Sequence, residues 1–305
     1  VLMMDLPFGN YSVYFNITQE IMGADIDEQK DIVISWDTKC YEKVIADLGK
    51  LCVRVLDMNN DVVSPADVYV DNGGIHSYVE PTDPDGYAKI IDIPLYNRTG
   101  NFYIINVFYF SPEFNVTVYN DTVSYKQENY SASITIMLEL YRLSIHVITY
   151  DGYDVDRFGV GYKHEKMDWR YCYSSGSIYV FHQVPSRKYI PQLELNISHW
   201  VSMWGIEVYN YTIIDGLTKN IFIDIFLPMY DHVRIDIYDY YLGTDRHIDY
   251  IYQANISLER TGVSYMFYDV IGFIDVHDAP YGENFTLNVT IQTKYYFLVS
   301  NNTII

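Results

Sequence analysis

The sequence has few basic residues and none of the short motifs that accompany common enzyme chemistries. Its 305 residues include 20 Lys and Arg against 40 Asp and Glu, a net charge of −20. Such a chain repels the phosphates of nucleic acids, so we expect no nucleic acid partner. The sequence also contains no Gly-X-Ser-X-Gly motif, phosphate-binding loop or dinucleotide fingerprint. We therefore expect a protein that is not an enzyme and has no catalytic residues.

Long apolar runs are missing as well. No stretch of the sequence has the roughly 20 consecutive apolar residues that a membrane-spanning helix needs. No charged segment followed by an apolar one marks a secretion signal after Val1. We expect a mature or internal part of a larger protein, with any membrane anchor outside these residues.

Cysteine is scarce, with three residues in the chain. Cys40 and Cys52 flank the connection formed by residues 38–50, and a disulfide between them would contribute about 2–4 kcal/mol of stability. The alternative is that all three cysteines are buried thiols. Cys172 has no evident partner in the sequence.

Strand-forming residues dominate what is present. The chain has 33 tyrosines, 17% aromatic and 49% hydrophobic residues, enough to build cores and to exclude general disorder. Tyrosine favours strands and tolerates half burial on a sheet surface. Apolar and polar residues alternate, as half-buried strands require, in segments that include 51–57, 66–70, 101–109 and 133–138. The sequence predicts an all-β protein.

A strand that leads through proline into an aromatic strand recurs along the chain. The prolines are Pro7, Pro94, Pro185 and Pro280, at intervals near ninety residues. Opening strands recur on the same period at 51–57, 143–147 and 233–239, and closing strands at 31–35, 134–137 and 220–225. Several short strands per period predict tandem immunoglobulin-like antiparallel β-sandwich domains.

The repeat divides the chain into four parts. Residues 1–50 are interpreted as the C-terminal half of a sandwich plus a linker, 51–140 and 141–229 as sandwiches, and 230–305 as a sandwich that lacks its closing strand. A sandwich without an edge strand leaves backbone groups unpaired. We favour a window of a longer repeat protein; the alternative is that neighbouring subunits complete each other by donating a strand.

N-glycosylation signals indicate export. Most of the asparagines belong to an Asn-X-Ser/Thr pattern. At background usage, a serine or threonine would follow two residues after an asparagine only about one time in eight. Such enrichment predicts N-linked glycans and an extracellular location. The alternative is that Ser and Thr alternate with apolar residues on strands and create the pattern by accident. The candidate sites are Asn10, Asn16, Asn97, Asn115, Asn120, Asn129, Asn196, Asn210, Asn255, Asn284, Asn288 and Asn301.

Acidic loops are the main candidates for bound cations. Asp57 and Asp61 lie in one predicted loop, and Asp83 and Asp85 lie in a Thr-Asp-Pro-Asp-Gly turn. Calcium binds such groups of oxygen ligands, so these four residues are candidate calcium ligands; no other cofactor is expected. The alternative is ordinary turn chemistry, in which Asp side chains accept hydrogen bonds from their own backbone.

Histidines and aromatic clusters give weaker signals. The eight histidines show no metal-ligand spacing, which predicts surface or core roles. The aromatic segments at 169–173 and 199–204 could together form a carbohydrate-binding platform. The interpretation we favour is that they pack in the core and between sheets.

The order of elements in residues 51–138 resembles carboxypeptidase-regulatory-like, or prealbumin-like, sandwich repeats of the immunoglobulin type. Asp57 after the opening strand, the turn at 82–86 and Pro94 after Ile93 carry this resemblance. In style the whole chain resembles archaeal surface-layer proteins and extracellular filament glycoproteins, with its Tyr-rich strands, acidity and dense glycosylation signals.

These resemblances imply a structural cell-surface glycoprotein, part of a lattice or filament, whose partners are copies of itself. The alternative is an adhesin or ligand-binding module. Exposed aromatic residues would discriminate them, because lattice contacts place such residues along the flanks of the sandwiches and a ligand site places them at one tip.

Overall fold

The structure is a computed structural model that describes residues 9–19, 24–34, 48–71, 77–95, 102–237, 251–270, 272–292 and 298–304. All regular elements in these ranges are strands, so the predicted all-β class is confirmed. The chain divides into two compact units, Val1–Tyr141 and Arg142–Ile305. Within the described ranges we find no helix long and apolar enough to cross a membrane.

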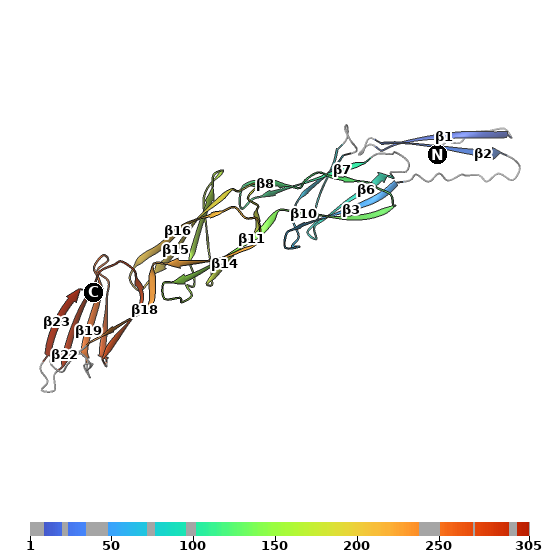
Figure 1. Cartoon of the computed structure of the whole chain (residues 1–305). Coiled ribbons are helices and arrows are strands. Elements are labelled where there is room, and N and C mark those ends of the chain that lie inside the picture. The colour runs from blue at the N-terminus through green and yellow to red at the C-terminus, as the bar shows by residue number, and fades with distance from the viewer. Residues whose placement is uncertain are drawn as a thin grey trace. The chain divides into compact units, whose positions relative to one another are not determined.

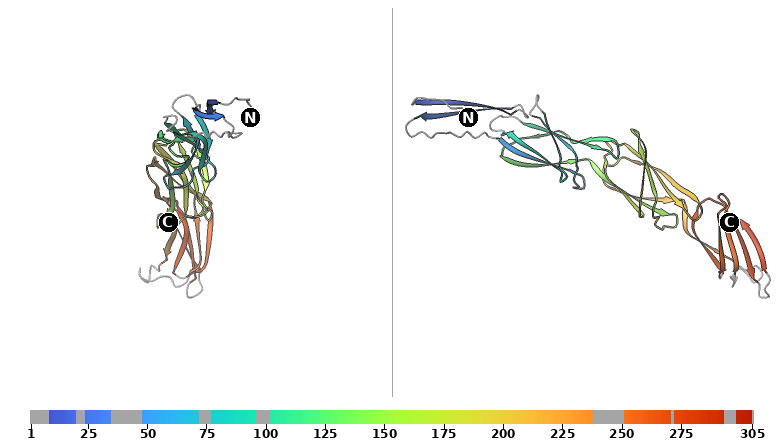
Figure 2. Two further views of the ribbon diagram at one scale, coloured as in Figure 1. Left: turned by 90° about the vertical axis from the view of Figure 1, so that its right-hand side faces the viewer. Right: turned by 180° about the vertical axis from the view of Figure 1, so that it is seen from behind.

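The first unit begins with a two-stranded hairpin. β1 (Gly9–Gln19) and β2 (Ala24–Ile34) pair antiparallel along their whole length, as Figures 1 and 2 show. The closing strand predicted at 31–35 falls at the end of β2, with Ser35 outside the described residues. The described part of the predicted half-sandwich is therefore a hairpin.

A first sandwich follows in the same unit. Its strands form the sheets β10-β3-β6 and β5-β4-β7-β8, with β9 pairing to β7. Leu51, Val53 and Val55 alternate along one strand, and all three are fully buried. This alternation places one side of the strand in the core, as the sequence predicts. The bounds are β3 (Leu48–Asp57), β4 (Asp67–Asp71), β5 (Ser77–Pro81), β6 (Tyr87–Pro94), β7 (Tyr103–Ser111), β8 (Val116–Tyr119), β9 (Val123–Tyr125) and β10 (Ser131–Leu138).

The second unit contains two sandwiches in sequence. Numbered along the chain, these are the second and third sandwiches. The second sandwich has sheets β14-β11-β17 and β13-β12-β15-β16. The third sandwich has sheets β18-β21 and β20-β19-β22-β23 (Figure 1). The bounds are β11 (Leu140–Thr149), β12 (Gly159–His164), β13 (Met167–Tyr173), β14 (Ile178–Pro185), β15 (Gln192–Val201), β16 (Ile206–Asp215), β17 (Ile221–Leu227), β18 (Met229–Asp236), β19 (Ile251–Leu258), β20 (Ser264–Val270), β21 (Phe273–Pro280), β22 (Phe285–Gln292) and β23 (Leu298–Ile304).

The recurring prolines each end a strand, one in each sandwich, as the repeat predicts. β6 ends at Pro94, β14 at Pro185 and β21 at Pro280. Proline fixes φ and has no N–H to donate, which suits it to a strand end. In the first sandwich the Tyr103 hydroxyl donates a hydrogen bond to the Pro94 carbonyl oxygen at 2.8 Å, which ties the next strand to this step.

The opening and closing strands pair in parallel, which the sequence did not predict. β10 lies parallel to β3 in the first sandwich and β17 lies parallel to β11 in the second. The neighbouring pairs β3–β6, β4–β5, β4–β7, β7–β8, β7–β9, β12–β13, β12–β15 and β15–β16 are antiparallel. The predicted antiparallel sandwiches are thus confirmed with one parallel pair in each.

The third sandwich has an open groove beside β18. Among the described residues β18 pairs only with β21. The groove beside it has a volume of about 440 Å³ and is lined by apolar residues from both sheets, among them Val233, Ile235, Ile256, Val276 and Phe285. Val233 and Ile235 on β18 are half-buried. The alternating residues of β3, by contrast, are fully buried, and β3 has a neighbouring strand on each side.

His146 links the parallel pair of the second sandwich to an adjacent loop. Its Nδ1 lies 2.8 Å from Asp224 Oδ1, across the β11–β17 pair, and its Nε2 lies 2.9 Å from Asp154 Oδ1. The hydrogen bond to Asp224 raises the pKa of His146; desolvation opposes this, and the hydrogen bond to Asp154 adds to the rise.

We expect His146 to make the stability of the chain fall as pH rises. Its folded pKa is raised above the unfolded value of about 6.5, so its stabilising contribution is complete below that value and is lost as pH rises through the folded pKa. The effect should be on the order of 1 kcal/mol or less, because the aspartates are exposed. Urea unfolding from pH 5.5 to 9 measures it. The decrease of the free energy of unfolding with rising pH should be smaller in His146→Gln and unchanged in His182→Gln. An unchanged decrease in His146→Gln would contradict the role of His146.

Candidate functional site: the junction and the outer sheet of the second unit

The loop after β11 holds the start of the third sandwich. The Tyr150 backbone N–H donates to the Met229 carbonyl oxygen at 2.9 Å. The Asp151 carboxylate accepts hydrogen bonds from the backbone N–H groups of Asp231, at 3.0 Å, and His232, at 3.1 Å. Desolvation acts to raise the pKa of Asp151, but hydrogen bonds from the Thr149 hydroxyl and from these two N–H groups outweigh it and lower the pKa. The charged carboxylate therefore fixes the backbone of β18 to the second sandwich.

Trp204 forms the second contact of this junction. It lies in the tight turn between β15 and β16, where Gly205 adopts a φ of 63°. Its side chain is fully buried and meets the rings of Tyr265 and Phe285 edge-on, each with centroids 5.1 Å away. The indole N–H donates to the His277 carbonyl oxygen at 3.1 Å, and the Thr261 hydroxyl donates to the Trp204 carbonyl oxygen at 3.0 Å. A residue of the second sandwich is thus part of the core of the third.

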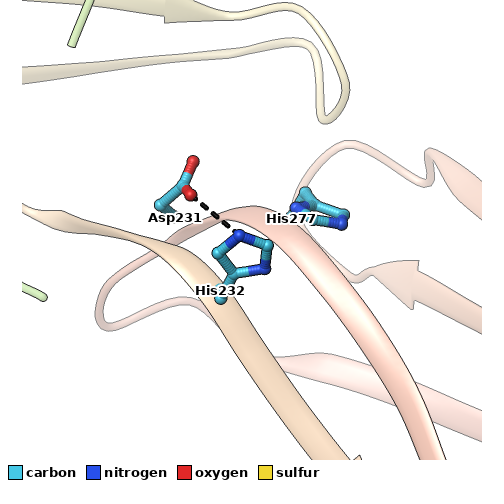
Figure 3. Close-up of side chains that lie close together, drawn as sticks. All are labelled: Asp231, His232 and His277. Atoms are coloured by element: carbon cyan, nitrogen blue, oxygen red, sulfur yellow. Dashed lines mark ion pairs between the residues drawn. The ribbon is translucent and has the colours of Figure 1, made fainter. Parts of the chain in front are cut away.

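Three metal-ligating side chains gather at the same junction (Figure 3). His232 on β18 is the cross-strand partner of His277 on β21, and their ring centroids lie 4.3 Å apart. The Nε2 atom of His232 lies 3.1 Å from Asp231 Oδ2. One possible ligand atom from each of the three residues lies within 4.8 Å of the others.

The sequence interpretation missed this cluster, because it searched for histidines at short spacings. Pairing of the opening strand at 233–239 with the strand that ends at Pro280 would have placed His232 opposite His277. The signal was therefore present, but only through the strand register.

Aromatic side chains also gather on the solvent-exposed face of the four-stranded sheet of the second sandwich, β13-β12-β15-β16. Tyr171 is 65% exposed and Tyr173 is 82% exposed. A Cβ on Gly161 would lie 2.8 Å from a ring carbon of Tyr171, so this glycine lets the ring lie against the sheet. Trp200, Tyr209 and Tyr211 are each at least half exposed on the neighbouring strands. The expectation that the segments at 169–173 and 199–204 pack inside is right for Trp204 and wrong for Tyr171, Tyr173 and Trp200. Alternation alone does not tell which side of a strand faces water.

The predicted calcium ligands serve their own turns. Asp57 Oδ1 accepts hydrogen bonds from the backbone N–H groups of Asn59 and Asp61 at 2.7 and 2.9 Å. Asp83 Oδ1 accepts from those of Asp85 and Tyr87 at 3.1 and 2.9 Å. These contacts match the turn-chemistry alternative. Within the described ranges, Asp57, Asp61, Asp83 and Asp85 are not gathered into one metal-binding group; calcium binding there stays a prediction.

The candidate glycosylation sites differ in accessibility. Asn115, Asn129, Asn284 and Asn288 are exposed. Asn120, Asn196, Asn210 and Asn255 are half-buried, and the side-chain amides of Asn120 and Asn210 donate hydrogen bonds to backbone oxygens. Asn10 and Asn16 lie on β1 and Asn301 on β23, while Asn97 lies outside the described residues. Glycosylation at all of these sites stays a prediction.

The predicted disulfide also stays a prediction. Cys52 is half-buried on β3, and Cys40 lies outside the described residues. Cys172 is half-buried on β13, where its thiol donates to the Val160 carbonyl oxygen at 3.4 Å.

Comparisons with known proteins identify no family. No protein-family model matches the chain, and no curated protein matches it. Among solved structures, the Bacillus anthracis TIE protein is 12% identical with a TM-score of 0.25, and this chain spans 59% of its length and is covered completely. The pilus adhesin SpaC from Lactobacillus rhamnosus GG, in its open conformation, is 10% identical with a TM-score of 0.39, over 95% of this chain and 43% of that one. A streptococcal ancillary pilin is 9% identical with a TM-score of 0.26, over 84% of this chain and 95% of that one. With TM-scores this low, the matches carry no argument about function.

Proposed function

We propose that this chain is a structural, extracellular glycoprotein that forms part of a cell-surface lattice or filament and has no enzymatic activity. The net charge of −20 and the dense glycosylation signals suit a hydrated outer surface. The junction of the second unit suits a load-bearing role, since Trp204 and Asp151 leave little freedom between its two sandwiches. Glycans on exposed strands and loops would protect sheet edges from unwanted pairing.

The exposed aromatic sheet is the observation that carries this proposal. Its tyrosines lie within β13 and β16, on the face of a sheet. Large exposed apolar patches mark interaction surfaces, and a sheet face is broad enough to contact another subunit. We propose a second copy of this chain as the partner. An adhesin would instead present its aromatic residues on loops at one end.

Imaging of the purified, glycosylated chain by electron microscopy, together with sedimentation, tests the proposal. We expect ordered assemblies that are lost in the double variant Tyr171→Ser, Tyr173→Ser and kept in Tyr130→Ser, whose tyrosine is 59% exposed outside that sheet. Mass spectrometry should find glycans at the exposed asparagines Asn115, Asn129, Asn284 and Asn288. An unglycosylated monomer that never assembles, with or without calcium, would refute the proposal.

The groove beside β18 favours strand donation as a second route of self-association. The closing strands β10 and β17 fill the corresponding position in the other sandwiches with apolar residues at every second position, such as Ile223, Ile225 and Leu227. Ile32 and Ile34 give residues 31–35 the same pattern. In this route, a second copy inserts that segment parallel to β18. A peptide of residues 29–36 should raise the midpoint of thermal unfolding, and the same peptide with both isoleucines replaced by serine should not.

A further inference from the structure

We propose that Asp231, His232 and His277 bind a divalent transition-metal ion of the zinc type at the junction of the second unit. Two imidazoles and one carboxylate form a set of three protein ligands that leaves a position for water. Imidazole nitrogen favours zinc, copper or nickel, whereas calcium and magnesium prefer sites made of oxygen. This inference is independent of the proposed function, because it concerns a ligand that a lattice, filament or adhesin could equally hold.

The distances are compatible with such an ion after small side-chain rotations. Ligand atoms about 2.1 Å from a tetrahedral metal lie about 3.4 Å from one another. Here they lie within 4.8 Å of one another, and Asp231 Oδ2 is already 3.1 Å from His232 Nε2. Figure 3 shows these two side chains facing each other, with His277 beside them on the neighbouring strand. Both histidines are exposed and Asp231 is half-buried, so an ion can enter from solvent.

The backbone that carries these ligands is fixed from several sides. Antiparallel pairing sets His232 opposite His277. The Asp151 carboxylate holds the N–H groups of both Asp231 and His232, and Trp204 holds the carbonyl oxygen of His277. The Tyr153 ring packs edge-on against His232 with centroids 5.5 Å apart. Each ligand backbone is therefore held by a residue of the second sandwich, which limits the conformational freedom that metal binding must remove.

Further charged groups surround the cluster. Asp278 follows His277 on β21 and is half-buried, and its carboxylate repels that of Asp231. His199 on β15 also lies close enough to act on the charge of Asp278. A divalent cation would relieve the repulsion between the two carboxylates. Metal binding should therefore stabilise the contact between β18 and β21.

Titration of the full-length, metal-free chain with zinc chloride tests the proposal, with calorimetry as the readout. We expect one tight site per chain, and cobalt in its place should give the intense visible absorption of a tetrahedral complex. His232→Gln and His277→Gln should each weaken zinc binding at least about tenfold, and Asp231→Asn should weaken it less. His182→Gln is the matched control, because His182 is exposed on a different strand, β14, and should leave the affinity unchanged.

Zinc binding that is unchanged when both histidines are replaced would overturn the proposal, as would calcium binding at these residues in place of zinc. Circular dichroism establishes that each variant is folded. Should a histidine variant fail to fold, the absorption spectrum of cobalt bound to the unmodified chain and to Asp231→Asn still decides, because a spectrum without tetrahedral nitrogen coordination contradicts the site.

Discussion

Replacement of Trp204 by alanine is expected to lower the free energy of unfolding by about 3–5 kcal/mol, the usual cost of deleting a large buried aromatic side chain. The indole is fully buried and packs against Tyr265 and Phe285. Its loss leaves a cavity and also removes the hydrogen-bond donor of the His277 carbonyl oxygen, 3.1 Å away. We expect the third sandwich to unfold first, which would add a step to the unfolding curve.

Urea unfolding of the full-length chain, followed by circular dichroism, measures this effect. Trp200→Ala is the matched control, because Trp200 is 59% exposed on the same hairpin; it should change the free energy of unfolding by no more than about 0.5 kcal/mol. Trp204→Phe should fall between the two, since it keeps much of the packing and loses the N–H. If Trp204→Ala and Trp200→Ala have equal effects, Trp204 does not join the two sandwiches as described.

Gly216→Ala is expected to destabilise the second sandwich by about 3 kcal/mol or more, because backbone atoms leave no room for a methyl group. A Cβ at this position would lie 1.9 Å from the Ile190 carbonyl oxygen and 2.7 Å from the Arg187 Cα. The Gly216 N–H also donates to the Pro191 carbonyl oxygen at 2.7 Å, so the chain cannot move away without losing that hydrogen bond. The close approach joins the link between β16 and β17 to the turn after Pro185.

Thermal and urea unfolding of the full-length chain test this substitution against Gly176→Ala. A Cβ at Gly176 would meet no atom within 4 Å, so that variant should be neutral or slightly stabilising. Comparable stability of the two variants would show that the contact at Gly216 is looser than described.

The sequence predicts well where strands lie along the chain, but it predicts poorly which strands pair with each other in a sheet. Alternation in residues 51–57 reports local burial and the proline at 94 reports a strand end, and the structure has both. The parallel pairing of β10 with β3 is not local, and a period of two residues is the same for parallel and antiparallel neighbours. The parallel pairing of strands about 80 residues apart is therefore seen only in the structure.

The exposure of side chains, and the clusters that they form between strands, are even harder to predict from the sequence. Tyr171 and Trp204 both belong to aromatic segments, yet one is 65% exposed and the other is fully buried. The difference arises because Trp204 lies in a turn that faces the next sandwich, a contact no local pattern records. His232 and His277 meet only because the β18–β21 register sets them opposite each other.

The parallel pairing of opening and closing strands has a consequence for how the sandwiches respond to pulling. The chain enters the second sandwich at the start of β11 and leaves it at the end of β17, and these strands lie side by side and point the same way. Tension on the two ends therefore acts along the strands in opposite directions and shears the pair. The evenly spaced hydrogen bonds between them must then break together, whereas an antiparallel pair at the same ends would unzip one bond at a time. We expect the intact sandwiches to withstand force better than their equilibrium stability alone would indicate.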